Sequence, residues 1–295
     1  MTELDKRAAR SRFARAASTS PEASVLAREV ERRMAERLDY VKHEPARILD
    51  AGCGLGDGLR LLRGRYPKAT LIGVDSAFAV VAPAISRQTI AGRALSQLLA
   101  RESHHLCADM ARLPLADASV GMVWSNLALA WAGEPLATLR EFQRVLEAGG
   151  LLMFSSYGPD TLKELKQAFA ATDSRPHVHR FIDMHDLGDM LLAAGFAEPV
   201  MDMEVITLTY PGVDALLRDL RLSGQTNVAR ERSRGLMGRR TWHAMIAGYE
   251  RTRREGRLPA SFEIVYGHAW KPRQRQSDAA GQRLVKVDFV PPKRR

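Results

Sequence analysis

Arg47-Ile48-Leu49-Asp50-Ala51-Gly52-Cys53-Gly54-Leu55-Gly56 is an apolar run that ends in a glycine-rich turn. A short run of this kind is typical of a parallel strand that is buried on both faces. The next residues, 59–65, continue with the apolar spacing of a helix. The segment therefore predicts a strand, a tight turn and a helix, which together begin a βαβ unit.

Strand and helix patterns alternate along the rest of the chain. An amphipathic helix at 22–40 precedes the turn. Further strands are expected at 69–75, 106–109, 119–125, 151–155, 204–209 and 261–270. Helices are expected at 160–170, 183–194, 213–222 and 239–255, together with one that Glu134-Pro135 opens and Gly149-Gly150 stops. The pattern predicts an α/β, Rossmann-like fold: a mostly parallel seven-stranded sheet with helices on both faces and a helical lid insertion.

The same pattern divides the chain into three parts. Residues 1–44 are expected to form a helical segment that closes over the site. Residues 45–270 are expected to form the main domain, with the lid at about 157–195. The polar and basic residues 271–295 are expected to be a disordered tail.

Composition limits the class of protein. Of the 295 residues, 45% are hydrophobic and 26% charged, an ordinary globular balance. No apolar run approaches the roughly 18 residues of a membrane span, and the charged residues 1–15 lack the apolar core of a secretory signal. Cys53 and Cys107 form no Cys-x-x-Cys pattern. We therefore expect a cytoplasmic protein that does not enter membranes.

Acidic residues end the first three predicted strands, at Asp50, Asp75 and Asp109. In a parallel sheet these ends meet at the edge where ligands bind. The turn reads Gly-x-Gly-x-Gly, unlike the Gly-x-Gly-x-x-Gly turn that holds a pyrophosphate. Gly52 and Gly54 would let the backbone pass close to a ligand that has no phosphate.

These features predict an S-adenosylmethionine site. Asp50 would orient the turn or accept the ligand's ammonium, Asp75 both ribose hydroxyls, and Asp109 the adenine amine. The predicted cofactor-binding residues are Asp50, Gly52, Cys53, Gly54, Gly56, Asp75, Ser76, Asp109, Met110 and Asn126. The alternative is a tight turn without a ligand and acids that only cap loops.

The same residues match class I S-adenosylmethionine-dependent methyltransferases over about 45–157. The wider sequence, about 12–270, resembles the malonyl-acyl-carrier-protein O-methyltransferase family, the BioC proteins of biotin synthesis. The matching segments are 12–17, 28–30, 125–131, 157–162, 177–186 and 266–270. The resemblance implies methylation of the free carboxyl group of a malonyl thioester, which lets fatty acid synthesis elongate it.

The chain departs from the family pattern near its N-terminus. Ser20-Pro21 stands where the family usually has Tyr-Asp, and Ala27-Arg28-Glu29 where it often has Gln-Arg-Glu. The departure concerns the acceptor and leaves the cofactor prediction unchanged. A complex I assembly family shares parts of the second half, which keeps protein arginine as an alternative acceptor. A non-catalytic assembly protein that retains the cofactor fold is a further alternative.

A malonyl carboxylate is already ionised near pH 7, so its methylation requires alignment and no general base. We therefore expect no catalytic acid or base. The acceptor pocket is predicted at the ends of the fourth and fifth strands, lined by Leu127, Trp131 and Tyr157, and Arg180 is the candidate partner for the carboxylate.

Histidines suggest a metal site only weakly. His177 and His179 are one residue apart and have no cysteine support, so we expect no metal. His104-His105 is expected to be an exposed turn before the third strand.

The net charge of +10 is concentrated in the arginine-rich residues 218–257. A basic surface attracts acidic partners, although it can also be a merely solvated face. Residues 126–129 lack the Asn/Asp-Pro-Pro-aromatic run of amino-directed nucleic-acid methyltransferases, so we expect no nucleic acid. We expect a monomer that docks acidic acyl carrier protein through Arg232, Arg234 and Arg239.

Overall fold

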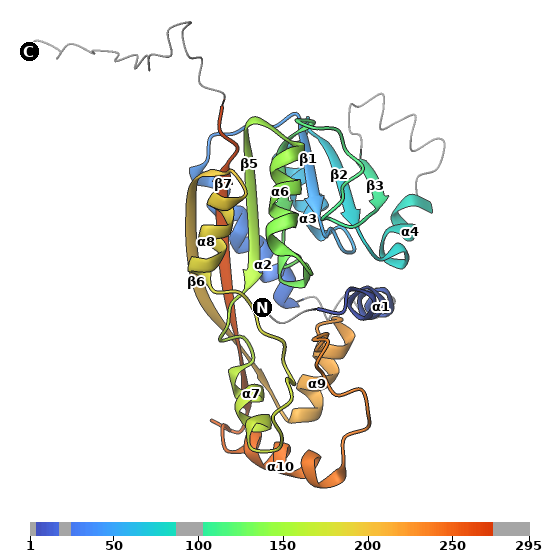
Figure 1. Cartoon of the computed structure of the whole chain (residues 1–295), viewed down its shortest axis with the longest axis vertical. Helices are drawn as coiled ribbons and strands as arrows, with labels where there is room; N and C mark the ends of the chain where they lie inside the picture. Colours follow the sequence, from blue (N-terminus) through green and yellow to red (C-terminus); the bar gives the residue numbers. More distant parts are fainter. Residues whose placement is uncertain (1–3, 18–24, 87–102, 274–295) are drawn as a thin grey trace, which may run out of the picture.

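The computed structural model describes residues 4–17, 25–86 and 103–273 (Figure 1). One seven-stranded sheet lies at its centre, and helices cover both faces. The predicted Rossmann-like α/β fold with a mostly parallel sheet is confirmed. From residue 274 onward, the predicted tail lies outside the described residues. Within the described ranges, no helix is both long and apolar enough to span a bilayer.

The sheet has the order β3-β2-β1-β4-β5-β7-β6. Its strands are β1 (Arg47–Ala51), β2 (Thr70–Asp75), β3 (Ser103–Cys107), β4 (Val120–Ser125), β5 (Leu146–Tyr157), β6 (Ala197–Tyr210) and β7 (Leu258–Trp270). Strands β1 to β5 are parallel, and β7 runs antiparallel between β5 and β6. Strands β2 and β3 lie on one side of β1, and β4 and the later strands lie on the other side. The strand order therefore reverses between β1 and β4. Ligands of open α/β sheets bind at this kind of reversal.

Helices pack on the sheet and beyond one end of it. They are α1 (Lys6–Ala16), α2 (Val25–Arg37), α3 (Asp57–Arg65), α4 (Phe78–Ser86), α6 (Pro135–Val145), α7 (Lys163–Ala170), α8 (Met184–Ala193), α9 (Val213–Leu222) and α10 (Arg239–Glu250), with 3-10 turns η2 (Leu38–Tyr40) and η3 (Leu129–Trp131).

Alternate strand residues face two separate core layers. Ile48 packs in the layer that α2 and α3 cover, and its neighbour Leu49 packs in the layer that α6 and α8 cover. Trp124 and Val123 of β4 divide in the same way. Successive strand side chains point to opposite faces, so a strand covered on both faces must be apolar throughout. The sheet is therefore held rigidly, and its strand ends can position functional groups.

The long hairpin of β6 and β7 extends past the parallel strands. Helices α7, α9 and α10 gather around its far end, and α1 lies between this group and the parallel strands (Figure 1). Helix α8, in the predicted lid, instead packs against α6 and β6. The second half of the lid therefore covers the sheet, and only the first half lies near the far end of the hairpin.

Several predicted boundaries were wrong. Strand β3 ends at Cys107, two residues before Asp109, and β6 begins at Ala197 instead of 204. His104-His105 lies inside β3, not in a turn before it, with His104 exposed. Gly149-Gly150 lies inside β5, because α6 already ends at Val145 and β5 begins at the next residue. Helix α10 ends at Glu250 instead of 255. Helix α4, which follows β2, was not predicted.

Candidate functional site

The glycine-rich turn is fastened to β2 by backbone hydrogen bonds. The amides of Gly52 and Cys53 both donate to the Val74 carbonyl, at 2.8 and 3.0 Å. Gly52 has a φ of +82°, and a Cβ there would lie 2.2 Å from the Cβ of Ala128. Only glycine adopts this left-handed conformation without strain and leaves room for so close an approach. The turn is thereby pressed against the segment that follows β4.

Asp75 at the end of β2 holds the next residues of both loops. Its Oδ2 accepts from the Gly54 amide at 3.2 Å, and its Oδ1 accepts from the Ala77 amide at 2.8 Å. Burial raises the pKa of Asp75, and its bonds to backbone amides partly offset that rise. The carboxylate is thus fixed in orientation next to the glycine-rich turn.

These groups line a cavity of about 610 Å³ at the ends of the parallel strands. That volume lies within the usual range for small-molecule and cofactor sites. The predicted cofactor-binding residues that line it are Asp50, Gly52, Cys53, Gly54, Asp75, Ser76, Asp109, Met110 and Asn126. Gly56 does not line it and instead lies at the N-cap of α3. Of the predicted acceptor residues, Leu127 and Trp131 line this cavity too.

Helix α1 covers the Asp109 side of the cavity. The Lys6 ammonium lies 3.3 Å from Oδ2 of Asp109, and both side chains are about half exposed. Oδ1 of Asp109 accepts from the Ala111 amide at 2.9 Å. The cavity therefore has the parallel sheet on one side and a helix from the N-terminal segment on the other.

Asn126 joins β4 to the N-terminal segment. Its Nδ2 donates to the Ala27 carbonyl at 2.8 Å, and its Oδ1 accepts from the Ser155 hydroxyl at 2.8 Å. The same hydroxyl accepts from the amide of Leu127 at 2.9 Å. Asn126 thus fixes α2 relative to the ends of β4 and β5.

Glu31 of α2 also lines the cavity, and sequence reasoning missed it. Its Oε1 accepts from the Trp124 indole at 3.1 Å. A Cβ at Gly58 would lie 2.3 Å from Glu31 Oε1 and 2.8 Å from Asp50 Oδ2, so the two carboxyl groups meet over this glycine. Glu31 lies on the buried face of α2 together with Val30 and Met34. An acidic residue on an otherwise apolar helix face was the feature of the sequence that could have identified it as a site residue.

Both carboxyl groups of this pair are buried. Burial raises the pKa of Glu31 to about 7, although the Trp124 hydrogen bond opposes the rise. Burial, Glu31 and Asp75 together raise the pKa of Asp50. The pair therefore favours bound protons or a neighbouring positive charge.

Glu31→Gln should make the protein more stable at pH 8 than the wild type. Between about pH 4.5 and 7 folded Glu31 keeps a proton that the unfolded chain has released, so stability falls as pH rises through this window. The variant, which keeps the oxygen that faces Trp124, avoids a penalty of about 3 kcal/mol above pH 7. Urea unfolding at pH 4.5 and 8 would measure the difference.

The matched control is Glu29→Gln on the same helix. Its hydrogen bonds to Arg32 and Arg33 lower the pKa of Glu29 to about 2, so this variant should gain nothing at pH 8. A stability gain in Glu31→Gln that is equal at both pH values would contradict the assignment.

Tyr157 and Arg180 lie apart from this first cavity. Tyr157 lines a second cavity of about 210 Å³, which shares Trp131 with the first. Arg180 is exposed and lines neither, although its neighbours His179 and Phe181 line the second. The structure thus brings Leu127, Trp131 and Tyr157 around two adjoining cavities and leaves Arg180 outside them.

His177 is engaged in packing. Its ring stacks on Phe169, with centroids 3.7 Å apart, and Nε2 lies 2.9 Å from Asp173. Across the described part of the chain, no group of three or more His, Cys, Asp or Glu side chains is placed to hold a metal ion.

Comparisons with known proteins agree with this geometry. Residues 49–154 match the family model described as a methyltransferase domain. The chain is 54% identical over 278 residues to a malonyl-acyl-carrier-protein O-methyltransferase of Laribacter hongkongensis, covering 93% of each chain. It is 49% identical to one of Gallionella capsiferriformans, covering 97% of each. A putative methyltransferase of Bacillus halodurans has a similar fold, with a TM-score of 0.54 and 14% identity over 83% of this chain and 99% of that one.

Proposed function

Because the chain belongs to the malonyl-acyl-carrier-protein O-methyltransferase family, we propose that it methylates the free carboxylate of malonyl-acyl carrier protein early in biotin synthesis. S-adenosylmethionine is the methyl donor. The observation that carries the proposal is the 54% identity that extends over 93% of both chains. The adjoining cavities support it, since a group-transfer enzyme has to hold two ligands side by side.

The first cavity fits the methyl donor. Asp75 is fixed where it can accept ribose hydroxyls, and the glycine at position 52 removes a side chain that would collide with Ala128. The Glu31–Asp50 pair suits a ligand ammonium, since a positive charge favours the ionised form of both acids. Arg10 and Arg28 line the same cavity and suit a ligand carboxylate.

The proposed chemistry assigns positioning, not proton transfer, to the chain. S-adenosylmethionine, when bound, supplies a methyl group on a positively charged sulfur, which a carboxylate oxygen can accept without losing a proton. The side chains of the site therefore hold and align the ligands and exclude water. Burial keeps the nearby Cys53 protonated by raising the pKa of its thiol, consistent with the absence of a nucleophilic role.

Transfer of label from methyl-tritiated S-adenosylmethionine to malonyl-acyl carrier protein tests the proposal directly. We expect a base-labile methyl ester on the malonyl group and no label on acetyl-acyl carrier protein, which has no free carboxylate. Absence of label despite measurable cofactor binding would refute the proposal. Label in arginine of another protein would support the alternative acceptor instead.

The described arginines near the second cavity offer a surface for the acidic carrier protein. Arg221, Met237 and Trp242 line the cavity, and Arg221 and Met237 are exposed. Leu236 beside it is fully exposed, at 103%. Arg234, Arg239 and Arg240 are exposed around the same loop. An exposed apolar residue with arginines near it suits an acidic partner that delivers a thioester into the cavity.

Arg232, which was expected to dock the carrier protein, makes hydrogen bonds within the chain. Its guanidinium donates to Asp5 at 2.9 Å and to the Ala229 carbonyl at 2.8 Å. It therefore ties the residue that caps α1 to the 229–232 turn. A charge reversal at Arg232 would disturb α1 as well as the docking surface, so Arg240 is the better residue to test.

The variant Arg239→Glu/Arg240→Glu should raise the KM for malonyl-acyl carrier protein about tenfold at low salt, with kcat unchanged. The loss should shrink at high salt, because exposed charges are screened. Acids suit the first turn of α10, so the fold should be retained. Steady-state kinetics at two ionic strengths would measure the effect.

The control for this variant is Lys42→Glu/Lys68→Glu, which makes the same charge change on exposed residues. These residues precede β1 and β2, so they lie at the end of these strands opposite the cofactor cavity. This control variant should leave the KM unchanged. An equal rise in KM in both variants would indicate a general charge effect and no docking surface.

A further inference from the structure

The second cavity lies between the far end of the β6–β7 hairpin and the segment 177–181. Its wall is mainly apolar and aromatic, from Trp131, Tyr157, Phe169, Phe181, Trp242 and Phe262. Trp131 and Gln225 line both this cavity and the cofactor cavity. The two cavities therefore share part of their wall.

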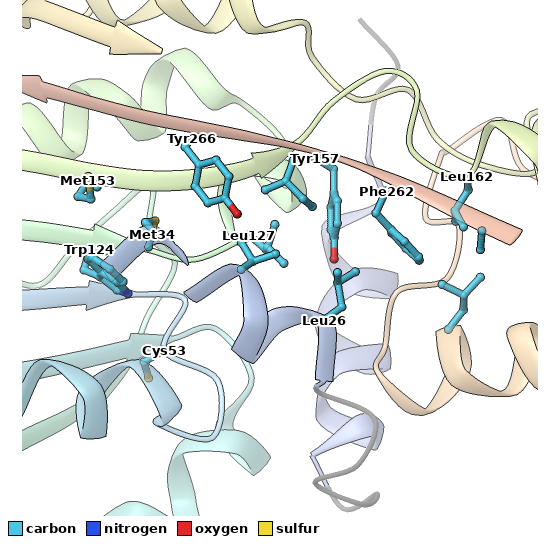
Figure 2. Packing of buried hydrophobic residues seen from close by; sticks show 14 of the residues in the cluster. Leu26, Met34, Cys53, Trp124, Leu127, Met153, Tyr157, Leu162, Phe262 and Tyr266 are labelled. Atoms are coloured by element: carbon cyan, nitrogen blue, oxygen red, sulfur yellow. The ribbon is translucent and has the colours of Figure 1, made fainter. Parts of the chain in front are cut away.

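Two of the side chains that line this cavity carry a buried polar atom that makes no hydrogen bond of ordinary geometry among the described residues, although the Gln225 side chain lies close enough to the Tyr157 hydroxyl to lower its pKa. These atoms are the Tyr157 hydroxyl and Nε2 of His179, and the two residues are only 1% and 2% exposed. Figure 2 shows Tyr157 in the core with Phe262 beside it, and their ring centroids are 6.2 Å apart. Buried polar groups are nearly always paired, because an unpaired group loses its bonds to water. Two such groups in the wall of one cavity are available to pair with a ligand.

The aromatic neighbours fix where these groups point. The His179 ring lies against Trp131, with centroids 4.8 Å apart, and against Phe181, at 4.4 Å. The Tyr157 ring lies against Phe181 at 5.2 Å. Phe181 thus packs on both rings, so Tyr157 and His179 are close neighbours in the wall of the cavity. Rings held in this way keep their polar atoms in place before a ligand arrives.

The charge around the cavity is positive. Burial, Lys166 and Arg12 lower the pKa of His179 to about 4, so the imidazole is neutral near pH 7. Arg221 lines the cavity directly. The nearby acid Asp219 accepts a hydrogen bond from the Tyr210 hydroxyl at 2.6 Å. A neutral imidazole and a phenol can each donate one hydrogen bond, and in this surrounding they suit the oxygen atoms of a small anion.

We propose that this cavity receives the malonyl group, and that Tyr157 and His179 donate hydrogen bonds to the malonyl oxygens that do not accept the methyl group. These oxygens are the thioester carbonyl and the second carboxylate oxygen. His179 donates from Nε2 in the tautomer that carries the proton there. The inference rests on the proposed function and assigns its substrate-binding side chains.

The arrangement also explains how the substrate enters. In this proposal the thioester arm passes Arg221 and Met237, the exposed residues of the cavity lining next to the basic surface. The carboxylate then points inward to Trp131, beyond which lies the cofactor cavity. An acetyl group, which lacks the second oxygen-bearing end, pairs with only one of the two donors.

The first test uses Tyr157→Phe, which removes one buried oxygen and nothing else. We expect the KM for malonyl-acyl carrier protein to rise about tenfold, the usual effect of losing one buried hydrogen bond to a charged group. The dissociation constant for S-adenosylmethionine, measured by calorimetry, should not change. Tyr266→Phe is the matched control, because its hydroxyl is also buried and makes no hydrogen bond of ordinary geometry with the described part of the chain, and Tyr266 lines neither cavity. It should leave the KM unchanged.

The second test separates binding from packing at His179. His179→Leu should raise the KM for malonyl-acyl carrier protein as Tyr157→Phe does, and His179→Gln, whose amide nitrogen can take the place of Nε2, should recover most of the loss. Rescue would not occur if the imidazole only filled space. An unchanged KM in both Tyr157→Phe and His179→Leu would overturn the inference while leaving the methyltransferase function intact.

Direct binding keeps the two proposals distinguishable. Malonyl- and acetyl-acyl carrier protein are titrated into protein saturated with S-adenosylhomocysteine. Tighter binding of the malonyl form by the wild type, lost in Tyr157→Phe and His179→Leu, supports the assignment even if no methyl ester forms. Equal binding of both carrier proteins by the wild type would overturn it.

Discussion

Asp75→Ala is expected to weaken S-adenosylmethionine binding at least about 100-fold, since a hydrogen bond to a charged group contributes roughly 1.5–3 kcal/mol and the carboxylate can accept two ribose hydroxyls. The carboxylate is already fixed by the Gly54 and Ala77 amides, so it needs no rearrangement to bind. Calorimetric titration of the purified variant would measure the change.

Two further variants show that the loss comes from the ligand contact. Asp75→Asn keeps one oxygen and should fall between wild type and alanine. Asp39→Ala removes an exposed acid that pairs with Arg65 at the surface, and it should bind the cofactor as the wild type does. Wild-type affinity in Asp75→Ala would refute the assignment of the first cavity as the cofactor site.

Gly52→Ala is expected to lower the free energy of unfolding by about 2–5 kcal/mol. Part of the loss is backbone strain, because alanine disfavours a φ of +82°. The rest is overpacking, because the new Cβ would lie 2.2 Å from that of Ala128, where neither backbone can withdraw easily. Thermal or urea unfolding would measure this loss.

Gly54→Ala provides the contrast within the same turn. Gly54 also has a positive φ, of +50°, but a Cβ there meets nothing within 4 Å. Its stability loss should be about 1 kcal/mol, from strain alone. Because Gly54 lines the cavity, its added methyl group should instead weaken cofactor binding. Equal stability losses in the two variants would show that the contact with Ala128 is unimportant.

The strand ends could be predicted because they follow from local pattern and sheet geometry. Asp50, Asp75 and Asp109 each follow an apolar run, and parallel neighbours bring such ends to one edge. The bounds of β3 were harder to predict, because this edge strand is only partly covered and contains polar residues such as His104. An apolar run marks only strands buried on both faces.

The remaining site residues depend on contacts that no local pattern contains. Glu31 interrupts an apolar helix face, and its partner Trp124 is distant in the chain. In the sequence His179 is only one residue of the predicted lid, whereas in the structure it is buried beside Trp131. Whether a buried polar atom has a partner is decided by tertiary packing, so these groups became visible only in the structure.

Helix α1 lines the cofactor cavity and is hydrogen-bonded to residues that line the second cavity. On one side Lys6 reaches Asp109 at the cofactor cavity. On the other, Arg12 donates to Thr226 and to the Asn227 carbonyl, both beside the second cavity, while Asp5 receives Arg232. A displacement of this helix that opens the cofactor cavity would also break its hydrogen bonds to Thr226 and Asn227, which line the second cavity. We therefore expect the binding of the two ligands to be coupled through α1.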